Sequence, residues 1–189
     1  MTDATARQLI GIAIPTLREL RAATLACISA GPGGEADAVH LLREAGFAGG
    51  PAVYEAFEQW LAEGGAPASA PELDLEDFGD LAARYFRDAG WGRVGFDASS
   101  EESVASISME DCWEADSTAG GSSPSCHVTT GMLASFFGKL ADYPVAVMEI
   151  ECLSADGERC RFLLGNPDVM TSKWEQIRST DETTDAPER

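Results

Sequence analysis

Four residues in the C-terminal half of the chain carry side chains that bind metal ions. Cys126, Glu149, Cys152 and Cys160 follow the spacing C-x22-E-x2-C-x7-C. Thiolate and carboxylate groups both suit zinc, and four protein ligands leave no open position for catalysis. The residue types and their number therefore predict a structural zinc site rather than a catalytic one.

A helix is expected to position the first of these ligands. Apolar residues at helical spacing predict a helix over residues 126–141, with Ser125 as its N-cap. Cys126 then lies in the first turn, where the helix dipole favours the thiolate over the thiol. This placement would help Cys126 to bind a metal ion.

A strand pair is expected to position the other ligands. Residues 145–153 and 159–165 have the composition of two strands, and the segment 155–158 between them contains a glycine suited to a tight turn. Cys152 and Cys160 flank this turn almost symmetrically, so they can face each other. A helix packed on the pair can bring its N-terminus to the same end.

Three residues compete for the fourth ligand position. In an ideal strand Glu149 and Cys152 point to opposite faces, because their separation is odd. Glu149 therefore needs a β-bulge, or a strand that ends near Glu151. Glu151 and His127 are the alternatives. The competing interpretation of the whole pattern is that the cysteines are ordinary buried residues and that Glu149 lies on the surface.

Composition limits the class of protein. The 189 residues suggest one domain with tails, and the net charge of -19 argues against nucleic acid and anionic lipid as direct partners. No apolar run is long enough for a membrane span, and the first residues lack the features of a signal peptide. We therefore expect a cytoplasmic protein, in which clustered cysteines more often bind metal than form disulfides.

Motifs for catalysis are missing. The sequence contains no HExxH, GxSxG, GxGxxG or phosphate-binding loop, and it has only two histidines. His127 beside Cys126 is a formal candidate for a thiol enzyme, but adjacent residues on a helix point about 100° apart. The sequence therefore favours a binding protein over an enzyme.

The N-terminal half is expected to be mainly helical. Helices are predicted over residues 5–30, 36–63 and 74–89. Pro15 is expected to kink or divide the first, and Cys27 within it to be a small buried residue.

The second helix contains a glycine-rich stretch at 46–51, which predicts either a bend or a close contact between two helices. Two antiparallel strands are expected at 91–96 and 104–113. The tail from residue 166 onward is polar, with a short helix around Met170 and Trp174 and disorder over 180–189.

Several of these segments together resemble a known family. The stretches LLREAGFAGG, AGWGRV, SCHVTTGMLASFFGKL and VMEIECLSADGERCRF are similar to the 4-vinyl-reductase-type small-molecule-binding domain. That family includes standalone "hydrocarbon-binding" proteins and the sensory modules of phenol-responsive transcription activators. The resemblance covers roughly residues 36–165, between a helical segment at 1–35 and the tail at 166–189.

The resemblance implies a fold, a metal site and a pocket. The family is α+β, with N-terminal helices packed on a small antiparallel sheet, similar to heme-based nitric-oxide-binding domains and trafficking-particle subunits. Its structural zinc positions correspond to Cys126, Glu149, Cys152 and Cys160, which favours Glu149 over Glu151. Positions that line the pocket in phenol sensors correspond to Phe136, Val147 and, as a weaker match, Ala105.

Departures from the family shape the functional expectation. Phenol sensors hold the phenol hydroxyl with a histidine and a tryptophan, and His40 and His127 do not match the expected position. We therefore expect a larger or more apolar aromatic ligand, bound by a standalone zinc-stabilised sensory domain that forms a homodimer and signals through a separate partner. The alternatives are an accessory or carrier protein in tetrapyrrole metabolism and a ligand-free interaction subunit.

Overall fold

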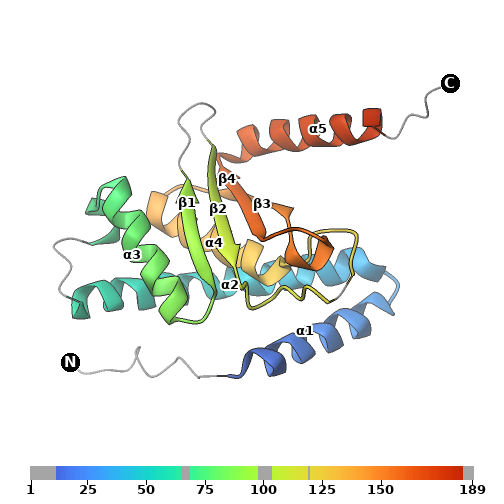
Figure 1. Cartoon of the computed structure of the whole chain (residues 1–189), viewed down its shortest axis with the longest axis horizontal. Helices are drawn as coiled ribbons and strands as arrows, with labels where there is room; N and C mark the ends of the chain where they lie inside the picture. The colour runs from blue at the N-terminus through green and yellow to red at the C-terminus, as the bar shows by residue number, and fades with distance from the viewer. Residues whose placement is uncertain (1–11, 65–68, 98–103, 119, 185–189) are drawn as a thin grey trace.

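The structure is a computed structural model that describes residues 12–64, 69–97, 104–118 and 120–184. Its five helices and two short 3-10 helices follow the order shown in Figure 1: α1 (Ile14–Ser29), α2 (Gly34–Glu63), η2 (Ala70–Glu72), α3 (Leu75–Asp88), α4 (His127–Ala141), η3 (Leu153–Ala155) and α5 (Pro167–Thr184). No helix in these ranges combines the length and the apolar character that crossing a membrane requires.

A four-stranded antiparallel sheet forms the centre of the fold. Its strands are β1 (Arg93–Asp97), β2 (Val104–Glu110), β3 (Ala146–Glu151) and β4 (Cys160–Gly165), in the order β1-β2-β4-β3. Helix α4 lies against one face of this sheet, and α2 crosses on the far side of α4 (Figure 1). The predicted α+β class, with helices packed on a small antiparallel sheet, is confirmed.

Aromatic side chains fill the core between these layers. The rings of Phe57 from α2, Phe86 from α3 and Phe136 from α4 are fully buried. The centroid of the Phe136 ring lies 5.7 Å from that of Phe57 and 5.2 Å from that of Phe86. Phe162 of β4 is also fully buried. The helical apolar spacing in the sequence therefore corresponds to a packed core rather than to an exposed surface.

Glycines allow α2 and α4 to approach each other closely. A Cβ atom on Gly46 would lie 2.0 Å from the carbonyl oxygen of Val128, and one on Gly131 would lie 2.0 Å from that of Arg43. Helix α2 nevertheless continues from Gly34 to Glu63 with Pro51 inside it. The glycine-rich stretch therefore marks a close helix contact, and the helix is not interrupted there.

Two expectations for the first helix are wrong. Pro15 does not kink α1 but stands in its first turn, where its missing N–H costs no hydrogen bond. Cys27 is exposed rather than buried, because α1 has no buried residue and contacts the body of the protein mainly through polar groups.

The ends of other elements also differ from prediction. Strand β2 stops at Glu110 because Asp111 adopts a left-handed conformation with φ 56°. Helix α5 is longer than the predicted short helix and includes residues 180–184, for which the sequence predicts disorder; residues 185–189 of that prediction lie outside the described residues. Met170 is buried, whereas Trp174 is exposed.

The helix contact gives a direct test of the packing. We expect Gly131→Ala to lower the free energy of unfolding by about 1–3 kcal/mol or more, because its methyl group meets the backbone of α2. Gly49→Ala is the matched control, since a Cβ there meets nothing within 4 Å and alanine favours a helix by about 0.5–1 kcal/mol. Urea unfolding measures both; equal stability of the two variants would contradict this account.

Candidate metal centre and ligand cavity

The four residues singled out by their spacing meet in one buried cluster. One ligand atom from each of Cys126, Glu149, Cys152 and Cys160 lies within 4.8 Å of all the others. Cys126 occupies the central position, because its Sγ lies 3.8 Å from that of Cys152 and 3.6 Å from that of Cys160. The cluster joins the start of α4 to the ends of β3 and β4.

These separations suit a tetrahedral metal site. Ligands that bind zinc at about 2.3 Å with tetrahedral angles lie about 3.8 Å from one another. The two sulfur–sulfur distances agree with this spacing, and no disulfide joins these cysteines. The arrangement can therefore hold a metal ion with four protein ligands, and the chemistry of three thiols and a carboxylate favours zinc.

An irregular strand directs Glu149 into the cluster. The register between β3 and β4 shifts between Glu149 and Glu151, and β3 ends at Glu151. Both features that could bring Glu149 to the cysteines are therefore present. Glu149 Oε2 accepts a hydrogen bond from the backbone N–H of Cys126 at 2.8 Å, whereas Oε1 is buried without a hydrogen-bond partner. An ion bound by the thiols would satisfy this atom.

The two alternative ligands lie outside the cluster. Glu151 accepts a hydrogen bond from the Glu158 backbone N–H and forms ion pairs with Arg159 and Arg161. His127 is buried beside Cys126, but it is not part of the group of candidate ligands. Burial, reinforced by nearby arginines, lowers the pKa of His127 to about 4, so its imidazole is neutral at pH 7.

Burial changes the acidity of the cluster in a way that favours a cation. Desolvation, followed by repulsion from Cys152, raises the pKa of Glu149 to about 9. Hydrogen bonds from the thiols of Cys126 and Cys160 hold the pKa of Cys152 well below its ordinary value. Negative charge therefore concentrates on buried sulfur, where a divalent cation would neutralise it.

The start of α4 uses a capping residue that the sequence pattern did not indicate. Cys126 rather than Ser125 is the N-cap, and its own side chain makes no capping hydrogen bond. Instead, the buried carboxylate of Glu114 accepts hydrogen bonds from the backbone N–H groups of Val128 and Thr129. Glu114 follows β2 by several residues in an irregular segment, so no helix pattern in the sequence pointed to this role.

Two arginines of α1 hold the segment that precedes α4. Arg21 donates to Glu114 Oε1 at 2.9 Å and to the carbonyl oxygen of Ser125. Arg18 donates to the carbonyl oxygens of Trp113 and Cys112. Helix α1 therefore fixes the backbone on both sides of the cluster without entering the core.

Cys112 is a second residue whose role the sequence pattern did not indicate. Its side chain is buried, and its Sγ lies 3.9 Å from that of Cys126. The thiols of Cys126 and Cys160 hold the pKa of Cys112 well below its ordinary value through hydrogen bonding. Its position at the end of a predicted strand gave no sign of this contact, because the turn at Asp111 directs it inward.

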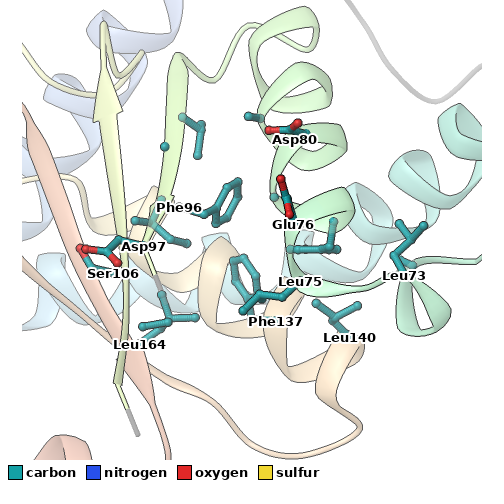
Figure 2. Close-up of a pocket in the computed structure, with 18 of the residues that line it drawn as sticks. Leu73, Leu75, Glu76, Asp80, Phe96, Asp97, Ser106, Phe137, Leu140 and Leu164 are labelled. Atoms are coloured by element: carbon teal, nitrogen blue, oxygen red, sulfur yellow. The ribbon is translucent and has the colours of Figure 1, made fainter. Parts of the chain in front are cut away.

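An open cavity of about 850 Å³ lies between α3 and the strands β1 and β2, at some distance along the sheet from the cysteines. In Figure 2, Phe96, Phe137, Leu140 and Leu164 face this cavity from the sheet and α4. Glu76 and Asp80 of α3 lie along its opposite side. The cavity is thus mainly apolar with two carboxylates at one wall.

The predicted pocket residues are divided between this cavity and the core. Ala105 lines the cavity. Phe136 is fully buried among the rings of Tyr54, Phe57 and Phe86, and it does not line the cavity. Val147 pairs with Leu164 on the neighbouring strand and is partly buried. The wall residues of α4 and β1 were not apparent from the sequence, because their apolar spacing is equally typical of core packing.

Comparison with known proteins confirms the resemblance. Residues 105–166 match the family model of the 4-vinyl reductase domain. The match spans β2 to β4 and includes all four residues of the candidate metal centre. No curated protein sequence matches the chain.

Solved structures share the fold. The phenol-responsive sensory domain of the transcription activator PoxR, solved with phenol, has a TM-score of 0.63 at 17% identity, covering 87% of this chain and 81% of that one. A palmitate-bound trafficking protein particle complex subunit 3 from Naegleria fowleri has a TM-score of 0.58 at 10% identity, covering 80% and 93%.

A vinyl-4-reductase family protein from Methanocaldococcus jannaschii gives a TM-score of 0.48 at 13% identity, covering 84% of this chain and 83% of that chain. At these identities, the likeness to the PoxR domain and the trafficking subunit concerns the fold.

The cluster predicts a specific effect of losing one ligand. We expect Cys152→Ser to abolish metal binding and to lower the free energy of unfolding by about 3 kcal/mol or more, because the cluster joins α4 to two strands. Cys27→Ser is the matched control, since Cys27 is exposed on α1. Elemental analysis and thermal unfolding of protein purified without chelator check this; unchanged metal content in Cys152→Ser would contradict it.

Proposed function

We propose that the chain is a small-molecule-binding domain whose ligand occupies the cavity between α3 and the β1–β2 edge of the sheet. The observation that carries the proposal is the cavity itself. Its volume of about 850 Å³ lies in the usual range for ligand sites, and most of its walls are apolar. Leu75 at its border is 68% exposed, the largest exposed fraction among the large hydrophobic side chains described.

The walls favour an uncharged aromatic or apolar ligand. Phe78, Phe96 and Phe137 contact one another edge-to-face beside the cavity, and such ring edges pack well against a further aromatic ring. None of the described residues that line the cavity is a lysine, arginine or histidine. The carboxylates of Glu76 and Asp80 would repel an anionic ligand, so a carboxylic acid fits poorly.

The metal centre would hold the structure rather than perform chemistry. Cys126, Glu149, Cys152 and Cys160 fill the coordination of a tetrahedral zinc ion, which leaves no place for a substrate. Zinc there would supply a rigid link between α4 and the β3–β4 pair. The function is therefore binding, and the signal passes to a separate partner, with the protein acting as a cytoplasmic homodimer.

One observation favours a second candidate function, a ligand-free interaction subunit. The space around Phe136, where relatives of this type are expected to bind ligands, is filled by Tyr54, Phe57 and Phe86. The cavity on the α3 side argues for a ligand, and the filled core around Phe136 argues that the ligand does not lie there.

Native mass spectrometry of the protein as purified, beside a denatured sample, separates these functions. We expect an excess mass of one zinc per chain together with a small organic molecule. Zinc without any bound molecule, after purification from cells and after incubation with aromatic compounds, would favour the interaction subunit. Absence of metal from protein kept reduced and free of chelator would contradict the structural centre.

A matched pair of probes tests the ligand class. We expect 1-naphthol to bind at least about tenfold more tightly than 1-naphthoate, because two carboxylates and no cation line the cavity. Ala105→Phe should weaken naphthol binding by filling the cavity, whereas Ala52→Phe, at an exposed position of α2, should not. Isothermal titration calorimetry measures all three; stronger binding of naphthoate would reverse the assignment.

A further inference from the structure

Cys112 stands in the same relation to Cys126 as two residues of the candidate metal centre do. The Sγ of Cys126 lies 3.9 Å from that of Cys112, 3.8 Å from that of Cys152 and 3.6 Å from that of Cys160. All three distances match the spacing of about 3.8 Å between ligands of one tetrahedral zinc ion. The cluster therefore offers five donors for four positions.

The chain holds Cys112 at this place from both sides. Asp111 adopts a left-handed conformation, which is unusual for a residue with a side chain, and it turns the backbone so that Cys112 becomes buried. The guanidinium of Arg18 donates to the carbonyl oxygens of Cys112 and Trp113. A residue held by a strained turn and by a distant helix is placed more firmly than ordinary core filling requires.

Glu149 is the ligand that Cys112 can replace. One carboxylate oxygen of Glu149 already accepts the Cys126 N–H, so the side chain keeps a hydrogen bond when it leaves the metal. If the thiol proton of Cys112 moves to the released carboxylate, the exchange leaves the net charge of the centre unchanged. Softer metals prefer sulfur to oxygen, which would shift the balance towards Cys112.

We propose that Cys112 is an alternate ligand of the metal centre, which shares the fourth position with Glu149. In the exchange the bond from the metal to the Glu149 oxygen breaks and a bond to Cys112 Sγ forms, while the thiol proton of Cys112 passes to the released carboxylate. Zinc is then held by three thiolates and Glu149, and a softer ion such as cadmium by four thiolates. The inference rests on the proposed metal centre.

The test uses the full chain, loaded with cobalt(II) and then with cadmium, and the thiolate-to-metal absorption counts the sulfur ligands. We expect Glu149→Ala to keep one cobalt per chain with an absorption about one third stronger than the unaltered protein, as three thiolates become four. Adding Cys112→Ser to that variant should remove the metal. A three-thiolate spectrum in Glu149→Ala, or loss of its metal, would overturn the proposal.

Cadmium provides a test that needs no change at Glu149. In the otherwise unaltered chain, Cys112→Ser should reduce the cadmium–thiolate absorption by about one quarter and leave zinc content unchanged. Equal cadmium absorption with and without Cys112 would overturn the proposal while leaving the centre intact. Failure of the unaltered protein to bind zinc, cobalt or cadmium would instead contradict the metal centre itself.

Discussion

The first turn of α4 is the point on which the rest of the structure depends. Its free N–H groups meet the buried carboxylate of Glu114, and Arg21 pairs with that carboxylate. A buried charge without partners would be costly, but here two backbone donors and a guanidinium satisfy it. Because Cys126 lies at the same helix end, this arrangement fixes the central thiol of the cluster and, through it, the ends of β3 and β4.

The elements that follow a regular apolar period could be predicted from the sequence. The helix over residues 126–141 and the two strands that follow it appear within about two residues of their expected ends. The need for an irregularity near Glu149 was also predictable, because the odd separation from Cys152 conflicts with the pleat of a strand. The structure contains that irregularity as a register shift in β3.

Features that depend on contacts between distant segments were not predictable in this way. Glu114 and Cys112 lie in irregular backbone after β2, and their roles come from a left-handed turn and from arginines of the first helix, far earlier in the chain. The glycines of α2 are compatible with a break in the helix, yet they accommodate the backbone of α4. Local propensity describes what a segment favours alone, whereas these residues are explained only by their partners in space.

Strand β4 connects the two sites described above. Cys160 is its first residue and Leu164, on the cavity wall, is its fifth, about 13 Å further along the strand. Hydrogen bonding to β2 on one edge and β3 on the other keeps both ends of β4 in register. The conformational entropy of this wall is therefore lost when the protein folds, so a molecule entering the cavity does not have to order it, and that part of the cost of association is removed from the binding equilibrium.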